Sequence, residues 1–172
     1  MGAKAAPCMH AGGGIKATSQ TTGSWVADLG RDGAHRHWAT ATSAPCTGLF
    51  KPVQVDRPLD LGPDPTDRFD PDTLWWRHEV LHRAVLADPA RLLPLIGADR
   101  DHVEARWLET PPEPADAFTE ADALTSRWID VIRSAGGPDR RPRRARRYWE
   151  LRDTRAGMIG VGPGTGQGAM HD

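Results

Sequence analysis

The first third of the chain contains two strand-like stretches, residues 19–29 and 34–43, in which apolar, β-branched and small hydroxyl residues predominate. Such stretches bounded by turn residues are typical of paired strands. The segment between them, residues 30–33, has a glycine at each end and an aspartate inside, which suits a tight hairpin turn. The pattern therefore predicts an antiparallel hairpin.

The turn also predicts the register of this hairpin. Symmetric closure, with Gly30 facing Gly33, places Trp25 opposite Trp38 and Val26 opposite His37.

A third strand is predicted over residues 48–55, where Pro52 indicates an edge strand or a bend. Residues 56–71 are rich in proline and aspartate, which predicts an extended connector. The strands thus occupy residues 18–55, after an irregular lead-in over residues 1–17.

Helical periodicity follows over residues 72–156. Asp70 is the expected N-cap of the first helix, with Pro71 at its first position. We expect one histidine on the apolar face of this helix and a Glu–Arg pair, four residues apart, on the outside. The apolar face comprises Leu74, His78, Leu81 and Val85, and the outer pair is Glu79 and Arg83.

Prolines and glycines divide the rest of this region into a short segment, residues 90–96, and three amphipathic helices. The helices are predicted over residues 99–109, 115–133 and 143–156, and each contains one tryptophan as a large apolar anchor: Trp107, Trp128 and Trp149. The longest has an apolar stripe at Ala117, Ala121, Leu124, Trp128 and Val131. The glycine-rich end, residues 157–172, is predicted to be disordered.

Composition favours one globular domain in the cytoplasm. The 172 residues are 38% hydrophobic and 26% charged, with two cysteines, too few for a disulfide framework. No apolar run approaches the roughly 20 residues of a membrane span, so we expect no membrane partner.

Charge is uneven along the chain although the net charge is −1. Residues 1–55 carry five basic and two acidic side chains, residues 56–130 carry eight and seventeen, and residues 131–172 carry nine and four. The basic run at residues 140–147, RRPRRARR, fits either a nucleic-acid patch or a solvated helix face that complements the acidic helices. A pI of about 6.7 favours the helix face, so no nucleic-acid partner is predicted.

Four motifs carry a resemblance to a known family: CMHAGG at residues 8–13, SQTTGSWVADL at 19–29, HWATATSAPCTGLFKP at 37–52 and LWWRHEVLHRAVL at 74–86. Together they resemble the C-terminal half of the secernin and cysteine-dipeptidase family of N-terminal-nucleophile (Ntn) hydrolases. The resemblance implies an α+β fold that forms part of an αββα sandwich. It also implies a small-peptide substrate, hydrolysis through a thioester, and no cofactor.

The same resemblance implies that the catalytic nucleophile lies outside this chain. Ntn hydrolases use the side chain of their first mature residue, with its own α-amino group as the base. Cys8 belongs to an internal motif, so we expect the chain alone to be inactive and, with sheet edges left open, to self-associate. It would contribute one substrate wall near His10, Thr22, Ser24 and His37. The oxyanion donor of some relatives is an asparagine, and this chain has none.

Three other interpretations stay open. The chain could be a non-catalytic scaffold or interaction protein. Cys8-x-His10 with His35-x-His37 could bind zinc, although the spacing departs from the usual structural sites. His78-Glu79-x-x-His82 matches the H-E-x-x-H pattern of zinc hydrolases, but no third ligand is recognisable. The simpler interpretation of Cys8 and Cys46 is that they are small buried apolar residues, and that of His37 is a hydrogen-bonded strand residue.

Overall fold

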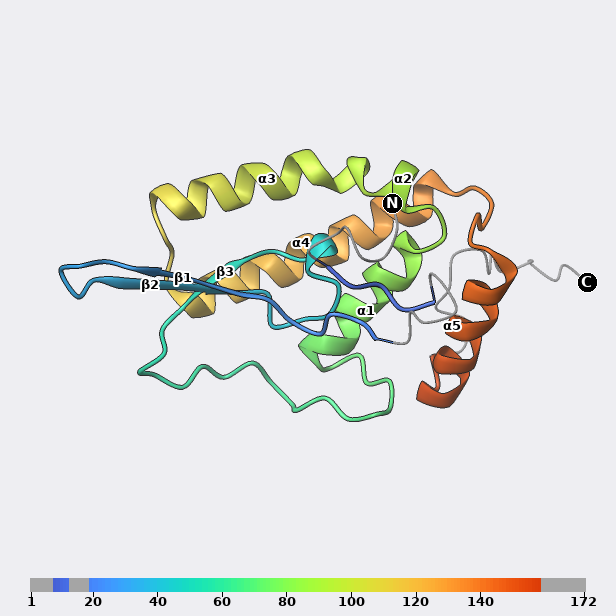
Figure 1. Ribbon diagram of the computed structural model, residues 1–172, viewed down its shortest axis with the longest axis horizontal. Helices are drawn as coiled ribbons and strands as arrows, with labels where there is room; N and C mark the ends of the chain where they lie inside the picture. Colours follow the sequence, from blue (N-terminus) through green and yellow to red (C-terminus); the bar gives the residue numbers. More distant parts are fainter. Residues whose placement is uncertain (1–7, 13–18, 159–172) are drawn as a thin grey trace, which may run out of the picture.

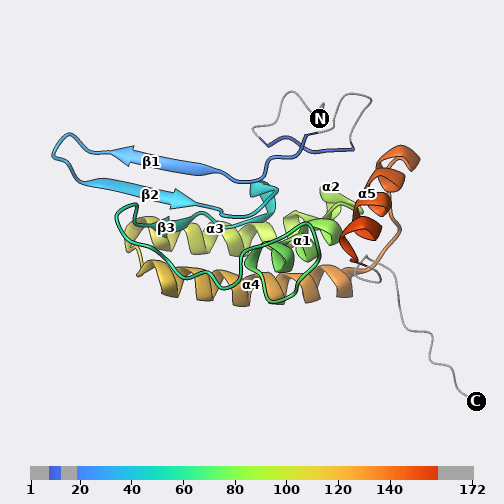
Figure 2. The same cartoon turned by 90° about the horizontal axis from the view of Figure 1, so that it is seen from below.

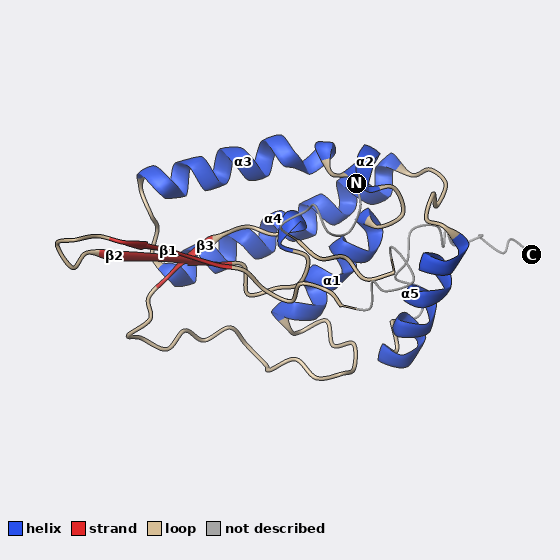
Figure 3. Cartoon of the chain, viewed as in Figure 1, coloured by secondary structure: helices blue, strands red, loops and turns tan. Residues whose placement is uncertain are grey.

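The computed structural model describes residues 8–12 and 19–158, and within them the fold is mixed α+β (Figure 1). A three-stranded antiparallel sheet is followed by helices (Figure 3). In chain order the elements are β1 (Trp25–Leu29), β2 (His35–Ala39), a 3₁₀ turn (Pro45–Thr47), β3 (Lys51–Val53), α1 (Leu74–Val85), α2 (Pro89–Leu92), α3 (Pro94–Glu109), α4 (Pro114–Ala135) and α5 (Arg143–Ala156). The predicted lead-in and the predicted disordered tail lie mainly outside the described residues.

The hairpin of β1 and β2 forms as predicted, but the predicted register is wrong. Trp25 pairs with Ala39, and Val26 pairs with Trp38. Because neighbouring residues of a strand point to opposite faces, Trp25 and Trp38 lie on opposite faces of the sheet. Trp38 is buried, whereas Trp25 is exposed and its ring packs edge-on against His37 at 5.5 Å between ring centroids.

The length of the turn explains the shift. The N–H of Gly30 donates to the carbonyl of Ala34 (3.2 Å), and the N–H of Gly33 donates to the carbonyl of Gly30 (3.2 Å). The loop therefore has three residues, and Gly33 takes the left-handed conformation with φ of 83°. A three-residue loop ending in a left-handed glycine is a common hairpin connection, and it moves every pair by one residue.

The third strand, Lys51–Val53, is shorter than the predicted residues 48–55, and a 3₁₀ turn at Pro45–Thr47 precedes it. Its proline lies on an edge strand, as expected, since the order of the sheet is β1-β2-β3. Figure 2 shows β3 beside the helices and the β1–β2 hairpin extending away from them. Burial follows this arrangement: Lys51 and Pro52 of β3 are buried, whereas all of β1 is exposed.

The main core lies between α1, α3 and α4. Helix α4 buries the predicted stripe, except that Ile132 replaces Val131, which is 40% exposed. The three tryptophan anchors, Trp107, Trp128 and Trp149, are all buried. The core comprises Leu49, Leu81, Ala84, Val85, Ala87, Leu92, Ile96, Val103, Trp107, Ala117, Ala121, Leu124, Trp128 and Ile132.

Helix α1 differs from its prediction at its start and on its outer face. Thr73 is the N-cap, and its hydroxyl accepts from the N–H of Trp76 (3.3 Å), while Asp70 belongs to the preceding turn. Glu79 and Arg83 do form an ion pair (2.5 Å), but both are buried, so their predicted outside position is wrong. The reason is α5, which packs over this face of α1 and brings Asp153 to 2.7 Å from Arg83.

The basic run pairs with acidic side chains at its start. Arg140 lies 3.2 Å from Asp88, and Arg141 lies 2.7 Å from Asp139. No described helix is both long and apolar enough to cross a membrane.

Candidate functional site

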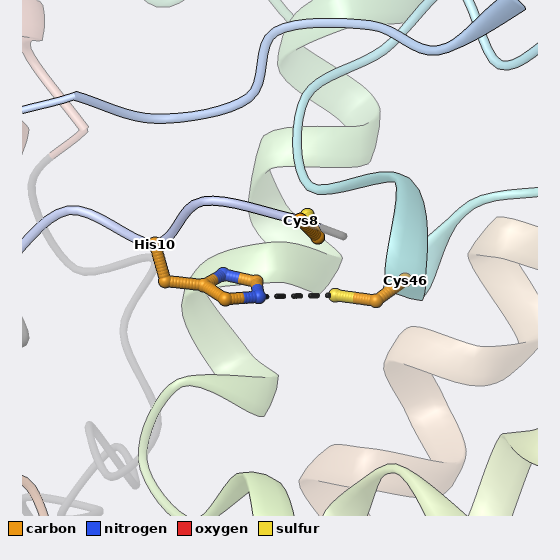
Figure 4. A group of neighbouring side chains, drawn as sticks. All are labelled: Cys8, His10 and Cys46. Atoms are coloured by element: carbon orange, nitrogen blue, oxygen red, sulfur yellow. Dashed lines mark hydrogen bonds between the residues drawn. The ribbon is translucent and has the colours of Figure 1, made fainter. Parts of the chain in front are cut away.

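Two cysteines and a histidine from distant parts of the chain meet beside the 3₁₀ turn (Figure 4). Cys46 is the middle residue of that turn, and Cys8 and His10 come from the N-terminal segment. Two backbone contacts hold this segment in place: the N–H of Met9 donates to the Thr21 hydroxyl (2.8 Å), and the N–H of Thr21 donates to the Met9 carbonyl (3.0 Å). These hydrogen bonds tie the segment that carries Cys8 and His10 to the residues just before β1.

The donor atoms of the cluster are close together. Nε2 of His10 lies 3.6 Å from Sγ of Cys46, and all three donor atoms of Cys8, His10 and Cys46 lie within 4.8 Å of one another. Figure 4 shows the His10 imidazole pointing at the Cys46 sulfur, with Cys8 above the dashed line that joins them. The Cys8 side chain is 7% exposed, and neither thiol forms a disulfide.

Burial governs the acid–base properties of the cluster. It raises the pKa of the Cys46 thiol to about 12, and the neighbouring Cys8 adds to the effect. Burial also lowers the pKa of His10, and the nearby His82 lowers it further. The metal-free cluster therefore favours a neutral thiol at Cys46 and a neutral imidazole at His10.

A buried polar network on α1 lies next to this cluster. The Ser43 hydroxyl donates to Glu79, whose two carboxylate oxygens each lie 3.4 Å from Nδ1 of His82. Burial alone would raise the pKa of Glu79, but His82 and Arg83 outweigh it and hold that pKa below its ordinary value.

The first histidine of the H-E-x-x-H motif has a different partner. Nε2 of His78 lies 3.0 Å from the hydroxyl of Thr47. Complete burial lowers the pKa of His78 to about 3, with a further contribution from His82. His78 is therefore a neutral, hydrogen-bonded core histidine.

The four residues predicted to form a substrate wall lie in different places. His10 lines a cavity of about 370 Å³ together with Cys46 and His82. Thr22 lines a second cavity, of about 590 Å³, and Ser24 lines a third, of about 310 Å³. His37 is on the hairpin against Trp25. The structure does not bring these four side chains into one cavity.

Among the described residues, neither of the two metal-binding patterns considered from the sequence forms a compact group of ligands. In the described part of the chain, Cys8, His10 and Cys46 are the only three potential ligands whose donor atoms gather this closely. His35 and His37 are on the projecting hairpin, and the H-E-x-x-H residues do not form such a group. Sequence reasoning missed Cys46 as a partner of Cys8 and His10, because only the fold brings residues 8–10 to residue 46.

Comparisons with known proteins found no match: no family model, no curated protein and no solved structure matches this chain.

Proposed function

We propose that this chain forms the peptide-binding part of a small-peptide hydrolase of the secernin type, within an αββα sandwich that a second segment completes. The observation that carries the proposal is the cavity of about 590 Å³ beside Thr22. Small-ligand sites typically have volumes of about 300–1,000 Å³, an apolar lining and a few polar groups. Its volume therefore suits a dipeptide.

The lining of this cavity supports a peptide ligand. Trp75, Trp76 and Trp149 offer apolar surface for a side chain. Arg152 and Arg155 line the same cavity, are exposed, and form no ion pair with another described residue. An arginine fork binds a carboxylate through two parallel hydrogen bonds, so these arginines suit the terminal carboxylate of a peptide.

The cysteines of this chain are poor candidates for the nucleophile. Attack requires a thiolate, and a pKa of about 12 leaves the Cys46 thiol protonated near neutral pH. Cys8 is buried, and neither cysteine lines the cavity beside Thr22. The nucleophile in this proposal is the N-terminal cysteine of the completing segment, and the open edge of β1 is where its sheet would pair.

Binding and turnover test the proposal separately. Titration of the purified chain with a dipeptide such as Leu-Arg, followed by calorimetry, should give saturable binding without hydrolysis. Arg152→Ala and Arg155→Ala should each weaken binding about tenfold, because each removes a charge-assisted hydrogen bond. The matched control is Arg144→Ala, an exposed arginine on the same helix outside the cavity.

Two results would contradict this proposal. Absence of dipeptide binding would favour the alternative of a non-catalytic scaffold. Turnover by the chain alone that disappears in Cys8→Ala would make Cys8 the nucleophile.

A further inference from the structure

We propose that Cys8, His10 and Cys46 bind one zinc ion through three protein ligands, with the fourth coordination position open to the cavity that His10, Cys46 and His82 line. This inference goes beyond the proposed function and does not depend on it.

The donor set and its spacing fit zinc. Two thiolates and one imidazole are ligands that zinc prefers, and three protein ligands leave room for a water or a substrate. Tetrahedral zinc with Zn–S of about 2.3 Å and Zn–N of about 2.0–2.1 Å separates sulfur from nitrogen by roughly 3.5–3.6 Å. Nε2 of His10 and Sγ of Cys46 already lie 3.6 Å apart. With all donors within 4.8 Å, the third ligand has to move by only about 1 Å.

An independent observation points to the open position. His82 is 1% exposed and lines the same cavity, and its Nε2 is buried with no hydrogen-bond partner among the described residues. Its other ring nitrogen, Nδ1, lies 3.1 Å from the Arg83 guanidinium and 3.4 Å from Glu79. Buried polar atoms in native proteins almost always have a partner. A zinc-bound water in the cavity would supply one, and His82 would then orient that water.

Cobalt titration of the reduced, metal-free full chain tests the site directly. We expect one Co²⁺ per chain, with the visible ligand-field bands of tetrahedral coordination and a thiolate-to-metal charge-transfer band, both lost when Zn²⁺ is added. Cys8→Ser, His10→Ala and Cys46→Ser should each weaken binding by more than about 100-fold. His82→Ala should keep one metal per chain.

The matched controls are His35→Ala and His37→Ala, which remove the two histidines that the sequence pattern alone would have used. Both should bind metal as the wild type does. Metal binding that survives Cys46→Ser, or that is lost in either control, overturns the assignment.

A second measurement needs no variant, so a folding defect cannot obscure the result. Iodoacetamide labelling of the wild-type chain, read by mass spectrometry, should modify Cys8 and Cys46 far more slowly with one equivalent of Zn²⁺ than without it. Equal labelling rates, or a Cys8–Cys46 disulfide that forms in spite of zinc, would overturn the proposal.

Discussion

Lys51 lies inside the protein with its charge poorly solvated. Its ammonium donates to the carbonyls of Thr40 (2.7 Å) and Leu49 (2.8 Å) and lies 4.9 Å from the centre of the Phe118 ring. Burial lowers the pKa of Lys51 to about 7, with only partial compensation from Glu104. Its sequence position, next to Pro52 in an edge strand, gives no sign of this burial.

The first prediction is that the free energy of unfolding rises with pH between about 7 and 9. In that window the unfolded chain keeps the proton of Lys51, whose ordinary pKa is 10.5, while the folded chain loses it. The rise reaches up to about 1.4 kcal/mol per pH unit. Lys51→Met should remove it, as measured by urea unfolding at a series of pH values.

The upper limit of that window comes from Cys46. Its raised pKa means that above pH 9 the unfolded chain loses a proton that the folded chain keeps. This offsets the Lys51 contribution up to about pH 10.5, so the free energy of unfolding levels off there and falls only at higher pH. A Lys51→Met variant with the same slope as the wild type between pH 7 and 9 would refute the assignment to Lys51.

The second prediction concerns the acid side. Because the pKa of His78 is about 3 in the folded chain and 6.5 when unfolded, the unfolded chain binds its proton first as the pH falls. Stability should therefore decrease from pH 6.5 towards 3. His78→Gln, which can still hydrogen-bond Thr47, should flatten this decrease in urea unfolding.

His102→Gln, at an exposed position of α3, is the matched control and should keep the wild-type slope. His10 and Glu79, whose pKa values are also lowered, contribute in the same direction, so some slope remains in His78→Gln. An unchanged slope would mean that the ring of His78 does not carry the effect.

Helices α1 and α5 are joined through one buried arginine. Arg83 pairs with Glu79 (2.5 Å) and with Asp153 (2.7 Å), and its guanidinium lies 3.9 Å from the centre of the Trp149 ring. Arg77, nearly two turns earlier on α1, pairs with Asp122 of α4 at the same 2.7 Å, but its side chain is 31% exposed. Arg83 is therefore more buried than Arg77 and has one more acidic partner.

The third prediction uses this difference. Arg83→Met should cost about 3–5 kcal/mol of unfolding free energy, because it leaves the buried Glu79 carboxylate without its cation. Arg77→Met should cost about 1 kcal/mol or less. Chemical denaturation at pH 7 measures both. Equal losses would mean that burial does not set the strength of these pairs.

Elements whose ends are marked by capping or turn residues could be predicted from the sequence. Helix α5 has the predicted bounds because Pro142 precedes it and Gly157, with φ of 80°, ends it. The hairpin was found from its glycines, but its register depends on whether Gly33 belongs to the loop or to a pair, which composition does not decide. The start of α1 was misplaced because Asp70 and Thr73 are both good N-caps.

Features created by packing between distant segments could not be predicted from the sequence. Glu79 and Arg83 have the spacing of an exposed helix pair, and only the docking of α5 buries them. Cys46 joins Cys8 and His10 because the 3₁₀ turn points it back at the N-terminal segment. Periodicity describes one element at a time and cannot report such contacts.

At the scale of the whole molecule, the sheet is unevenly covered. Figure 2 shows the β1–β2 hairpin extending away from the helices. Along β1, Trp25 is 63% exposed and Leu29 is 68% exposed, and they point to the same face. An exposed edge strand with large apolar side chains tends to pair with another chain, and a net charge of −1 opposes this only weakly.

The last prediction is that the isolated chain self-associates through β1. Light scattering should show a mass that grows with protein concentration, and Trp25→Thr with Leu29→Thr should shift it towards the monomer. Threonine keeps the strand preference while it removes apolar area. The matched control is Leu108→Thr with Leu151→Thr, two leucines about as exposed on α3 and α5, which should not change the association. A monomeric wild type, or an equal effect of the control pair, would contradict a role for β1. Under the proposed hydrolase function, the completing segment should compete for the same edge of β1 and reduce self-association.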